Sequence, residues 1–397
     1  MLKWRQLWHG WPKGLATIAI LLLLTRLIGH TRPIEHASRV MWDAIESALT
    51  PDSPPRPDVL LVTISAPDYQ FLFRNASPLD GDALAQLLAK IMASSPKRIF
   101  VDLDTADSKF AHLPLRIAYS LRCLRQGCPT GAYRREADSL CSASEAAPYS
   151  PVALAVELAE VSELVVWAQG IRIGNSGESE GLLPVLGALA HAKGGVVALQ
   201  ADSDGRVREL PEDLPHPPLP FWELAARDLG PETHADAVSH RHARPRLLPL
   251  LRPGVIPEIS AGEFLVKGAG NLSKKVVFLG GQYSAADRFY MADGLMHAGV
   301  TVLAAAAIAT AQNDFVKEFD GLEWSVKLAL ALCVWYGNHH FHNPWVKLAF
   351  VFGLLGLTCV VAVALAFQFG SILSLGGLLF AILLEQSVEG TVGHGQH

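Results

Sequence analysis

Two apolar runs and the segment between them determine the fold class of the central region. Residues 58–65 read DVLLVTIS and residues 98–103 read RIFVDL, and each run is apolar over the length of a β-strand. Between them, residues 80–94 (DGDALAQLLAKIMAS) place apolar side chains at helical spacing. Because both strands are apolar throughout, this strand–helix–strand unit indicates parallel strands with helices on both faces of the sheet.

The alternation of strands and helices continues toward the C-terminus. Further strands are expected at residues 164–168, 196–199 and 274–281. The run of small apolar residues at 299–311 (GVTVLAAAAIATA) predicts a helix in the centre of the domain. Two irregular excursions are expected: a cysteine-containing insert at 105–151, and a Pro-, His- and Arg-rich segment at 211–257 with one helix at 220–229. The central region is therefore predicted to be an α/β domain with a mostly parallel sheet.

The composition indicates a membrane protein. Hydrophobic residues make up 50% of the 397-residue chain and charged residues only 18%, whereas a soluble domain carries about 25% charged residues. The apolar excess lies in four stretches, at residues 14–29, 322–341, 345–367 and 371–388. Their lengths predict one N-terminal and three C-terminal transmembrane helices in a lipid bilayer. The formal net charge of −5 gives no reason to expect nucleic acid as a partner.

The first apolar stretch has two interpretations. Arg26, His30 and Arg32 end or follow it, where a secretory signal peptide would carry the small residues of its cleavage site. We therefore favour an uncleaved anchor over a cleaved signal peptide. The predicted organisation is an anchor at 1–30, an extracytoplasmic domain at 31–320, a three-helix membrane bundle at 321–389 and a cytoplasmic tail at 390–397.

Three cysteines, Cys123, Cys128 and Cys141, lie close together in the first excursion. Such clusters are typical of proteins in oxidising compartments. We predict a disulfide bond between Cys123 and Cys128, with Cys141 as the alternative partner. A metal site is the weaker interpretation, because no histidine is adjacent in sequence.

Several motifs in their order along the chain resemble one known family. They are IFVDLD (99–104), GGVVALQADSDGRVRELP (194–211), PEISAGEFL (257–265), KKVVFLGG (274–281), an isolated Asp287 and HAGVTVLAAAAIATA (297–311). Together they resemble the second-type CHASE domain, an extracellular sensory module associated with bacterial cyclases, histidine kinases and protein kinases. The resemblance covers residues 35–320, and one anchor before the domain with three helices after it is also similar to the family's architecture.

The resemblance implies a sensory domain in the periplasm and both termini in the cytoplasm of a bacterial inner-membrane protein. Two departures affect the corner that would hold the family's ligand. Ser65 stands where an acidic residue usually ends the first strand, and NASPLDG (75–81) replaces a Trp/Pro/Arg-rich turn. Residues 389–397 are too few for an output domain, so no kinase or cyclase is expected on this chain.

A polar ligand site is predicted where the strands end. Asp102 and Asp104 lie at the carboxyl end of a buried strand, and Asp287 follows the strand at 274–281. In open α/β sheets, ligands bind outside these strand ends. We expect the three carboxylates to converge at one sheet edge with Arg288 near them; solvated strand ends are the alternative.

Two other polar clusters are interpreted structurally. Asp202, Asp204 and Gly205 are expected to form a tight turn rather than a cation loop, with Arg208 paired to Asp204. The histidines near the membrane segments are expected to be interfacial residues rather than metal ligands (His339, His340, His342, His394 and His397). No cofactor motif and no catalytic triad is visible, so the protein is not expected to be an enzyme.

The C-terminal bundle carries a predicted docking surface. Small residues recur four apart, Ala349 with Gly353 and Gly370 with Ser374, and they let membrane helices approach closely. Glu385 lies near the end of the last helix, where it is expected either to contact a partner or to reach the interface.

These features predict a non-enzymatic sensor or accessory subunit. It would bind a small ligand or a partner outside the membrane and dock through its helices to a separately encoded effector; a homo-oligomer is also expected. The alternative is a structural scaffold of a multi-protein envelope or secretion complex. A periplasmic hydrolase that uses Asp102, Asp104 and Asp287 is a third, weaker interpretation.

Overall fold

The computed structural model describes only part of the chain. The described residues are 56–127, 154–173, 179–182, 193–199, 206–210, 219–230, 246–247, 255–291, 295–312, 317–318 and, with several gaps, 325–372; residues 106, 208, 269, 285 and 286 are excepted. The chain divides into two compact units, residues 51–315 and residues 1–50 together with 316–397. Each unit is described by itself.

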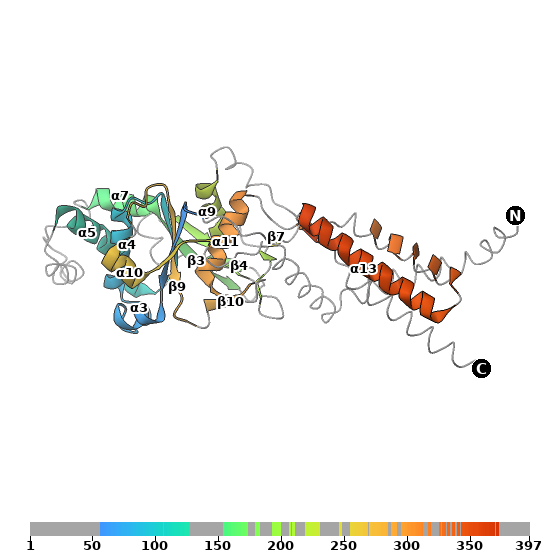
Figure 1. Ribbon diagram of the computed structural model, residues 1–397. Helices are drawn as coiled ribbons and strands as arrows, with labels where there is room; N and C mark the ends of the chain where they lie inside the picture. Colours follow the sequence, from blue (N-terminus) through green and yellow to red (C-terminus); the bar gives the residue numbers. More distant parts are fainter. Residues whose placement is uncertain are drawn as a thin grey trace. The chain divides into compact units, whose positions relative to one another are not determined.

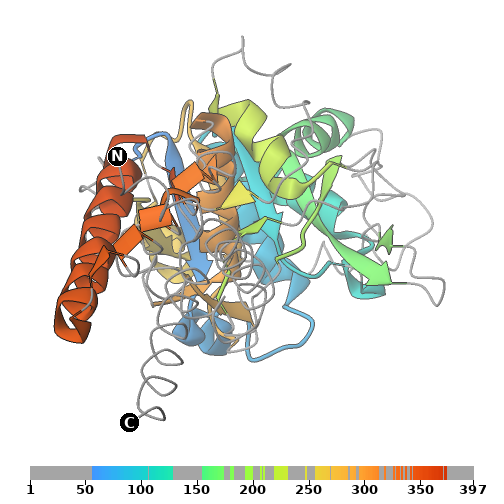
Figure 2. The ribbon, with the colours of Figure 1, turned by 90° about the vertical axis from the view of Figure 1, so that its right-hand side faces the viewer.

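The unit at 51–315 is built on a seven-stranded sheet (Figure 1). Six strands follow the order β4-β3-β2-β9-β1-β8, and β5 also pairs with β3. All pairings in this sheet are parallel except that of β3 with β4. The strands are β1 (Val59–Ile64), β2 (Arg98–Asp102), β3 (Val165–Ile173), β4 (Ser179–Leu182), β5 (Lys193–Val196), β8 (Glu258–Ser260) and β9 (Val276–Gly281). Figure 2 shows β3 and β4, in green, at one end of the sheet.

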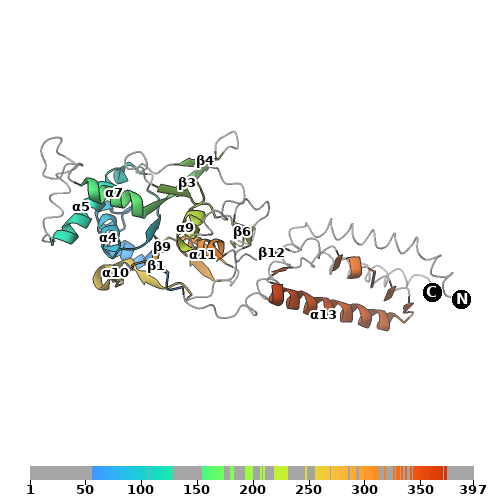
Figure 3. The same ribbon diagram turned by 90° about the horizontal axis from the view of Figure 1, so that it is seen from above.

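Helices cover both faces of the sheet (Figure 3). One face carries α4 (Gly81–Ala93), α5 (Leu113–Gln126), α7 (Ala155–Leu164) and α10 (Ala261–Lys267), and the other carries α9 (Phe221–Leu229) and α11 (Gly299–Gln312). Helices can pack on both faces because alternate residues of a strand point to opposite faces of the sheet. Val62 of β1 packs in the core cluster on the α4 face, which we call the first core cluster, and Leu61 packs in the cluster on the α11 face. The predicted α/β class with a mostly parallel sheet is confirmed.

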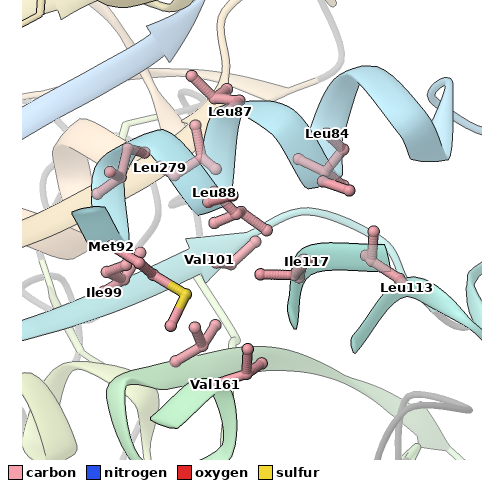
Figure 4. Close-up of a cluster of buried hydrophobic side chains, with 14 of the residues drawn as sticks. Leu84, Leu87, Leu88, Met92, Ile99, Val101, Leu113, Ile117, Val161 and Leu279 are labelled. Carbon is pink, nitrogen blue, oxygen red and sulfur yellow. The ribbon is translucent and has the colours of Figure 1, made fainter. Parts of the chain in front are cut away.

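The first core cluster shows why the predicted helix at 80–94 forms. Leu84, Leu87, Leu88 and Met92 of α4 belong to the same buried cluster as the strand residues Ile99, Val101 and Leu279 (Figure 4). Asp80 caps the helix: its Oδ1 accepts hydrogen bonds from the backbone N–H groups of Asp82 (2.9 Å) and Ala83 (3.2 Å). The spacing of apolar side chains and the N-terminal cap therefore both favour a helix that begins at Gly81.

The insert at 105–151 is not irregular at its start, and the prediction was wrong there. A 3-10 helix (Ser108–Phe110) leads into α5, which packs its buried side chains Leu113, Ile117 and Leu121 into the first core cluster. These residues recur every four positions, as an amphipathic helix requires. The nearby cysteines had led us to interpret this segment as part of an irregular insert. Cys123 lies in α5 and is half-buried, while Cys128 and Cys141 lie outside the described residues, so the disulfide stays a prediction.

Two smaller antiparallel pairs complete the described part of this unit. The strands β10 (Arg288–Tyr290) and β11 (Met296–Ala298) form a hairpin between β9 and α11. The strands β6 (Glu209–Leu210) and β7 (Arg246–Leu247) pair across the second excursion. In that excursion, the helix expected at 220–229 is present as α9, with Pro220 at its N-cap position.

The other unit contains α13 (Pro344–Phe369) and a short parallel pair, β12 (Lys317–Glu318) and β13 (Ser371–Ile372). The side chain of Asn343 starts α13 by accepting a hydrogen bond from the N–H of Trp345 (2.9 Å). Side chains of α13 are described only as far as Val360. In the described part of the chain, no helix combines the length and hydropathy of a membrane span.

Candidate functional site

The carboxyl ends of β2, β9 and β1 lie side by side, because β9 sits between the other two strands. At this edge Asp102 of β2 and Thr63 of β1 are both in register with Gly280 of β9. Residues that follow the three strands therefore gather at one place, although they come from distant parts of the sequence. We call this place the carboxyl edge.

Asp102 lies at the carboxyl edge, near enough to Asp287 for the charge of Asp287 to affect its pKa. Burial, and to a lesser extent the neighbouring charge of Asp287, raises the pKa of Asp102 to about 7. Burial also raises the pKa of Asp287, to about 6. Neither pKa is lowered by a hydrogen bond or by a basic side chain of the described residues. Among the described residues, no basic side chain thus offsets the effect of burial on these two acids.

Two glycines bring the start of α11 onto this pair. A Cβ atom at Gly280 would lie only 2.5 Å from Cβ of Val300, so only glycine lets the first turn of α11 approach the end of β9. A Cβ atom at Gly299 would lie 2.6 Å from Oδ1 of Asp287. The Asp287 carboxyl group consequently lies against the N-terminus of α11, where the helix dipole favours negative charge.

A pair of stacked tyrosines adjoins the carboxyl groups. The rings of Tyr69 and Tyr283 are 4.2 Å apart with an interplanar angle of 2°. Burial raises the pKa of Tyr283, and Tyr69, Asp287 and Asp104 contribute to the shift. Asp104 is exposed, and it lies close enough to Tyr283 for its negative charge to raise the pKa of Tyr283. The sequence reasoning missed both tyrosines; the position of Tyr283 just after the Gly280–Gly281 strand end was the only available signal.

Arg288 contacts the backbone at the carboxyl edge. Its side chain is exposed, and its Nη2 donates a hydrogen bond to the backbone carbonyl of Gln282 (2.9 Å). The structure therefore brings Asp102 near Asp287, Asp104 near Tyr283, and the Arg288 side chain to the backbone of Gln282 just after β9.

An acidic residue is nevertheless present after β1, three residues later than the family resemblance led us to expect. Ser65 and Asp68 form a capping box for α3 (Ala66–Phe71). The buried Asp68 carboxylate accepts hydrogen bonds from Ser65 Oγ (2.7 Å), Ser65 N (3.0 Å) and the N–H of Gly262 (3.0 Å). Asp68 thereby ties α3 to the first turn of α10, a structural role.

Among the described residues, Oγ1 of Thr105, just after Asp104, and Oε1 of Gln169 in β3 are buried polar atoms that lack a hydrogen-bond partner. A buried polar atom without a partner costs folding free energy unless water or a ligand forms a hydrogen bond with it.

No group of three His, Cys, Asp or Glu side chains in the described ranges could hold a metal ion.

Other predicted residues lie outside the carboxyl edge. Ala349 and Gly353 are exposed on α13, and nothing lies within 4 Å of the position that a Cβ atom of Gly353 would occupy. The close helix contact instead involves Gly337, where a Cβ atom would lie 2.5 Å from the ring of Phe350. The residues outside the described ones are Asp202, Asp204, Gly205, Arg208, Gly370, Ser374 and Glu385.

Comparison with known proteins identifies the family of the chain. Residues 16–337 match the family model of the CHASE2 domain. The match covers most of the chain, so the protein belongs to the CHASE2 family, and the resemblance seen in its motifs is confirmed. CHASE2 is a sensory domain rather than a catalytic one. No curated protein and no solved structure matches the chain.

Proposed function

We propose that the chain is a membrane-anchored sensor or accessory subunit of the bacterial cytoplasmic membrane. Residues 31–320 lie in the periplasm, and both termini lie in the cytoplasm. A small ligand or a partner acts at the carboxyl edge, and the C-terminal helices pass the change to a separately encoded effector. Membership in the CHASE2 family supports the sensory part of this proposal.

The observation that carries the proposal is the Asp102–Asp287 pair beside the first turn of α11. Two neighbouring, partly buried acids destabilise a fold in their charged form, because each carboxylate loses solvation and repels the other. Strongly shifted acids of this kind cluster at functional sites. They also lie where open α/β sheets bind ligands, outside the carboxyl ends of the strands.

The helix α11 supplies the route from this site toward the rest of the chain. It is the last helix of the 51–315 unit, and the chain continues from Gln312 into the 316–397 unit. Nearly all of its residues are buried, so it packs against α9 and the sheet along its whole length. A ligand that changes the charge beside Gly299 therefore acts directly on this helix.

The surface of α13 supports the membrane part of the proposal. Trp345, Phe352, Leu357 and Val360 are large apolar side chains, and all are exposed on the described part of α13. Apolar surface of this extent is normally covered by lipid or by another protein. The apolar stretches at 14–29 and 371–388, which lie outside or almost entirely outside the described residues, point the same way.

Site-specific photo-crosslinking in native membranes tests the proposal. A photoreactive residue in place of the exposed Phe352 should cross-link to a separately encoded protein. The neighbouring Val351 is 3% exposed and packs against Leu330, so the same replacement there should give no intermolecular product. Asp102→Asn should alter the yield from position 352, because it changes the charge at the carboxyl edge.

Three outcomes would count against parts of this reading. Cross-links that reach only lipid would contradict effector docking. Cross-links to a second copy of the chain alone would show a homo-oligomer instead. A partner that is captured equally with and without Asp102→Asn would favour a structural scaffold over a sensor.

A further inference from the structure

Basic side chains gather on the side of the sheet at which the parallel strands begin, which we call the amino edge. The backbone N–H of Lys97, just before β2, donates a hydrogen bond to the carbonyl of Lys275, just before β9 (2.8 Å). Lys274 precedes Lys275 in the chain, and Lys193 is the first residue of β5. Lys97, Lys193 and Lys274 are exposed, and Lys275 is half-buried. These lysines therefore form one basic surface although they come from distant parts of the sequence.

Acids offset only part of this charge. Asp228, at the end of α9, pairs with Arg98 at the start of β2 (3.0 Å), and Asp58 pairs with Arg56 (2.7 Å). Glu163, an exposed acid before β3, is also at this edge, and its backbone carbonyl accepts a hydrogen bond from Arg98. Within the described ranges, the other basic side chains of the amino edge take part in no ion pair: Lys97, Lys193, Arg227, Lys274 and Lys275.

The described part of the 51–315 unit begins and ends at the amino edge. At its start, the carbonyl of Asp58 accepts a hydrogen bond from the N–H of Val276, the first residue of β9 (2.9 Å). At its end, a Cβ atom on Gly230, just after α9, would lie 3.8 Å from the carbonyl oxygen of Ala311 in the last turn of α11. Since α9 reaches the amino edge through Asp228, α11 ends there as well. The chain therefore enters and leaves this unit on its basic side.

We propose that the amino edge rests on the anionic phospholipid headgroups of the membrane that anchors the chain, so that the carboxyl edge opens away from the lipid. The inference rests on the membrane anchoring in the proposed function and specifies the orientation of the same domain. Residues 313–321 join α11 to the apolar stretch at 322–341, and they span at most about 30 Å even when fully extended. This tether keeps the amino edge near the bilayer, where an anionic surface attracts basic side chains within a Debye length of about 8 Å.

The length of α11 gives the distance between the two edges. Its first turn lies against Gly280 at the carboxyl edge, and its last turn lies at the amino edge. Fourteen residues of helix extend over about 20 Å. When the amino edge lies on the headgroups, the carboxyl edge is therefore about 20 Å farther from them, and its ligand arrives from the aqueous phase.

Energy transfer from the full-length protein to a headgroup-labelled lipid tests this orientation in nanodiscs. A fluorescent amino acid in place of Ser273, an exposed residue beside Lys274, should transfer strongly in phosphatidylglycerol discs. The same amino acid in place of Asp107, which is exposed beyond the end of β2, should transfer much less. In phosphatidylcholine discs, or at about 1 M salt, where the Debye length is about 3 Å, transfer from position 273 should fall.

Lysine variants show whether charge causes the contact. Lys274→Gln combined with Lys275→Gln should lower the ratio of lipid-contacting to free orientations by about fivefold for each lysine removed. Lys109→Gln is the matched control, because Lys109 is an exposed lysine in the 3-10 helix that follows β2. It should leave the transfer from position 273 unchanged. All variants should unfold thermally like the parent protein, since the replaced side chains are not in the core.

Stronger transfer from position 107 than from position 273 would overturn the inference. So would transfer from position 273 that ignores lipid charge, salt and the lysine variants, because the tether alone would then explain it. A photo-cross-link from position 273 to a protein in native membranes would assign the basic surface to a protein partner instead. The proposed function fails separately: it fails when position 352 gives no cross-link to a separately encoded protein while the transfer from position 273 depends on lipid charge as expected.

Discussion

Single glycines set how closely α11 approaches the carboxyl edge. Gly280→Ala would place a Cβ atom 2.5 Å from Cβ of Val300, in a fully buried contact between a strand and a helix. Neither backbone can move freely, so the substitution should destabilise the protein by about 1–3 kcal/mol. Chemical denaturation of the full-length protein measures this loss.

Gly81→Ala is the matched control for Gly280→Ala. A Cβ atom at Gly81 would meet only the end of the Arg116 side chain, at 3.6 Å, which is an ordinary contact. Gly81 is the first residue of α4, where alanine is at least as favourable as glycine. Equal losses in the two variants would show that the close approach of Val300 is not what requires glycine at 280.

Asp68 illustrates how one carboxylate can hold two helices. Asp68→Ala removes the hydrogen bonds from Ser65 and from the N–H of Gly262, and it leaves that N–H without a partner. A loss of about 1–3 kcal/mol is expected from the cap and the unsatisfied donor.

A double-mutant cycle of Ser65→Ala and Asp68→Ala, read by denaturation, should show that the two losses are not additive, because the residues bond to each other. Additive losses would mean that Asp68 acts only through Gly262.

At the scale of the element, α5 is a helix in a segment that the sequence led us to expect to be irregular. Ile117 is fully buried in the first core cluster, and Leu124 on the same helix is 51% exposed. Ile117→Ala should therefore destabilise the protein by about 2–5 kcal/mol, while Leu124→Ala should change stability by less than about 0.5 kcal/mol. Thermal unfolding of both variants compares them directly.

If α5 were a loosely attached loop, the two substitutions would have similar small effects. The salt bridge between Arg116 of α5 and Asp82 of α4 (2.6 Å) gives a second contact between these helices. It lies at a partly exposed position and is expected to contribute little beside the buried side chains.

At the scale of the whole molecule, fused reporters test the proposed membrane topology. A reporter that is active only in the periplasm, fused after Asp320, should be active, because the proposal places residues 31–320 outside the cytoplasm. The same reporter at the C-terminus should be inactive, since both termini are proposed to be cytoplasmic. A cytoplasmic reporter that is active after Asp320 would contradict the whole arrangement.

The local sequence was sufficient for most of the individual elements of the 51–315 unit. Periodicity and apolar runs predicted six elements to within a few residues: β1, α4, β2, β9, α9 and α11. They could do so because the buried side chains of one helix or strand recur at a regular spacing within a short stretch of sequence. It failed for α5, whose pattern was read as part of a cysteine-rich loop, and for β5, which ends at Val196 instead of beginning there.

The tertiary structure alone decided the neighbours of each element and the chemistry at the carboxyl edge. Apolar runs do not state which strands pair, and β9 lies between β1 and β2 although it follows them by many residues. That pairing brings Asp287 near Asp102 and Tyr283 onto Tyr69, and the Arg288 side chain bonds to the carbonyl of Gln282 just after β9. Local sequence records a residue's own conformational preference and burial, whereas a pKa depends on which distant groups share its space.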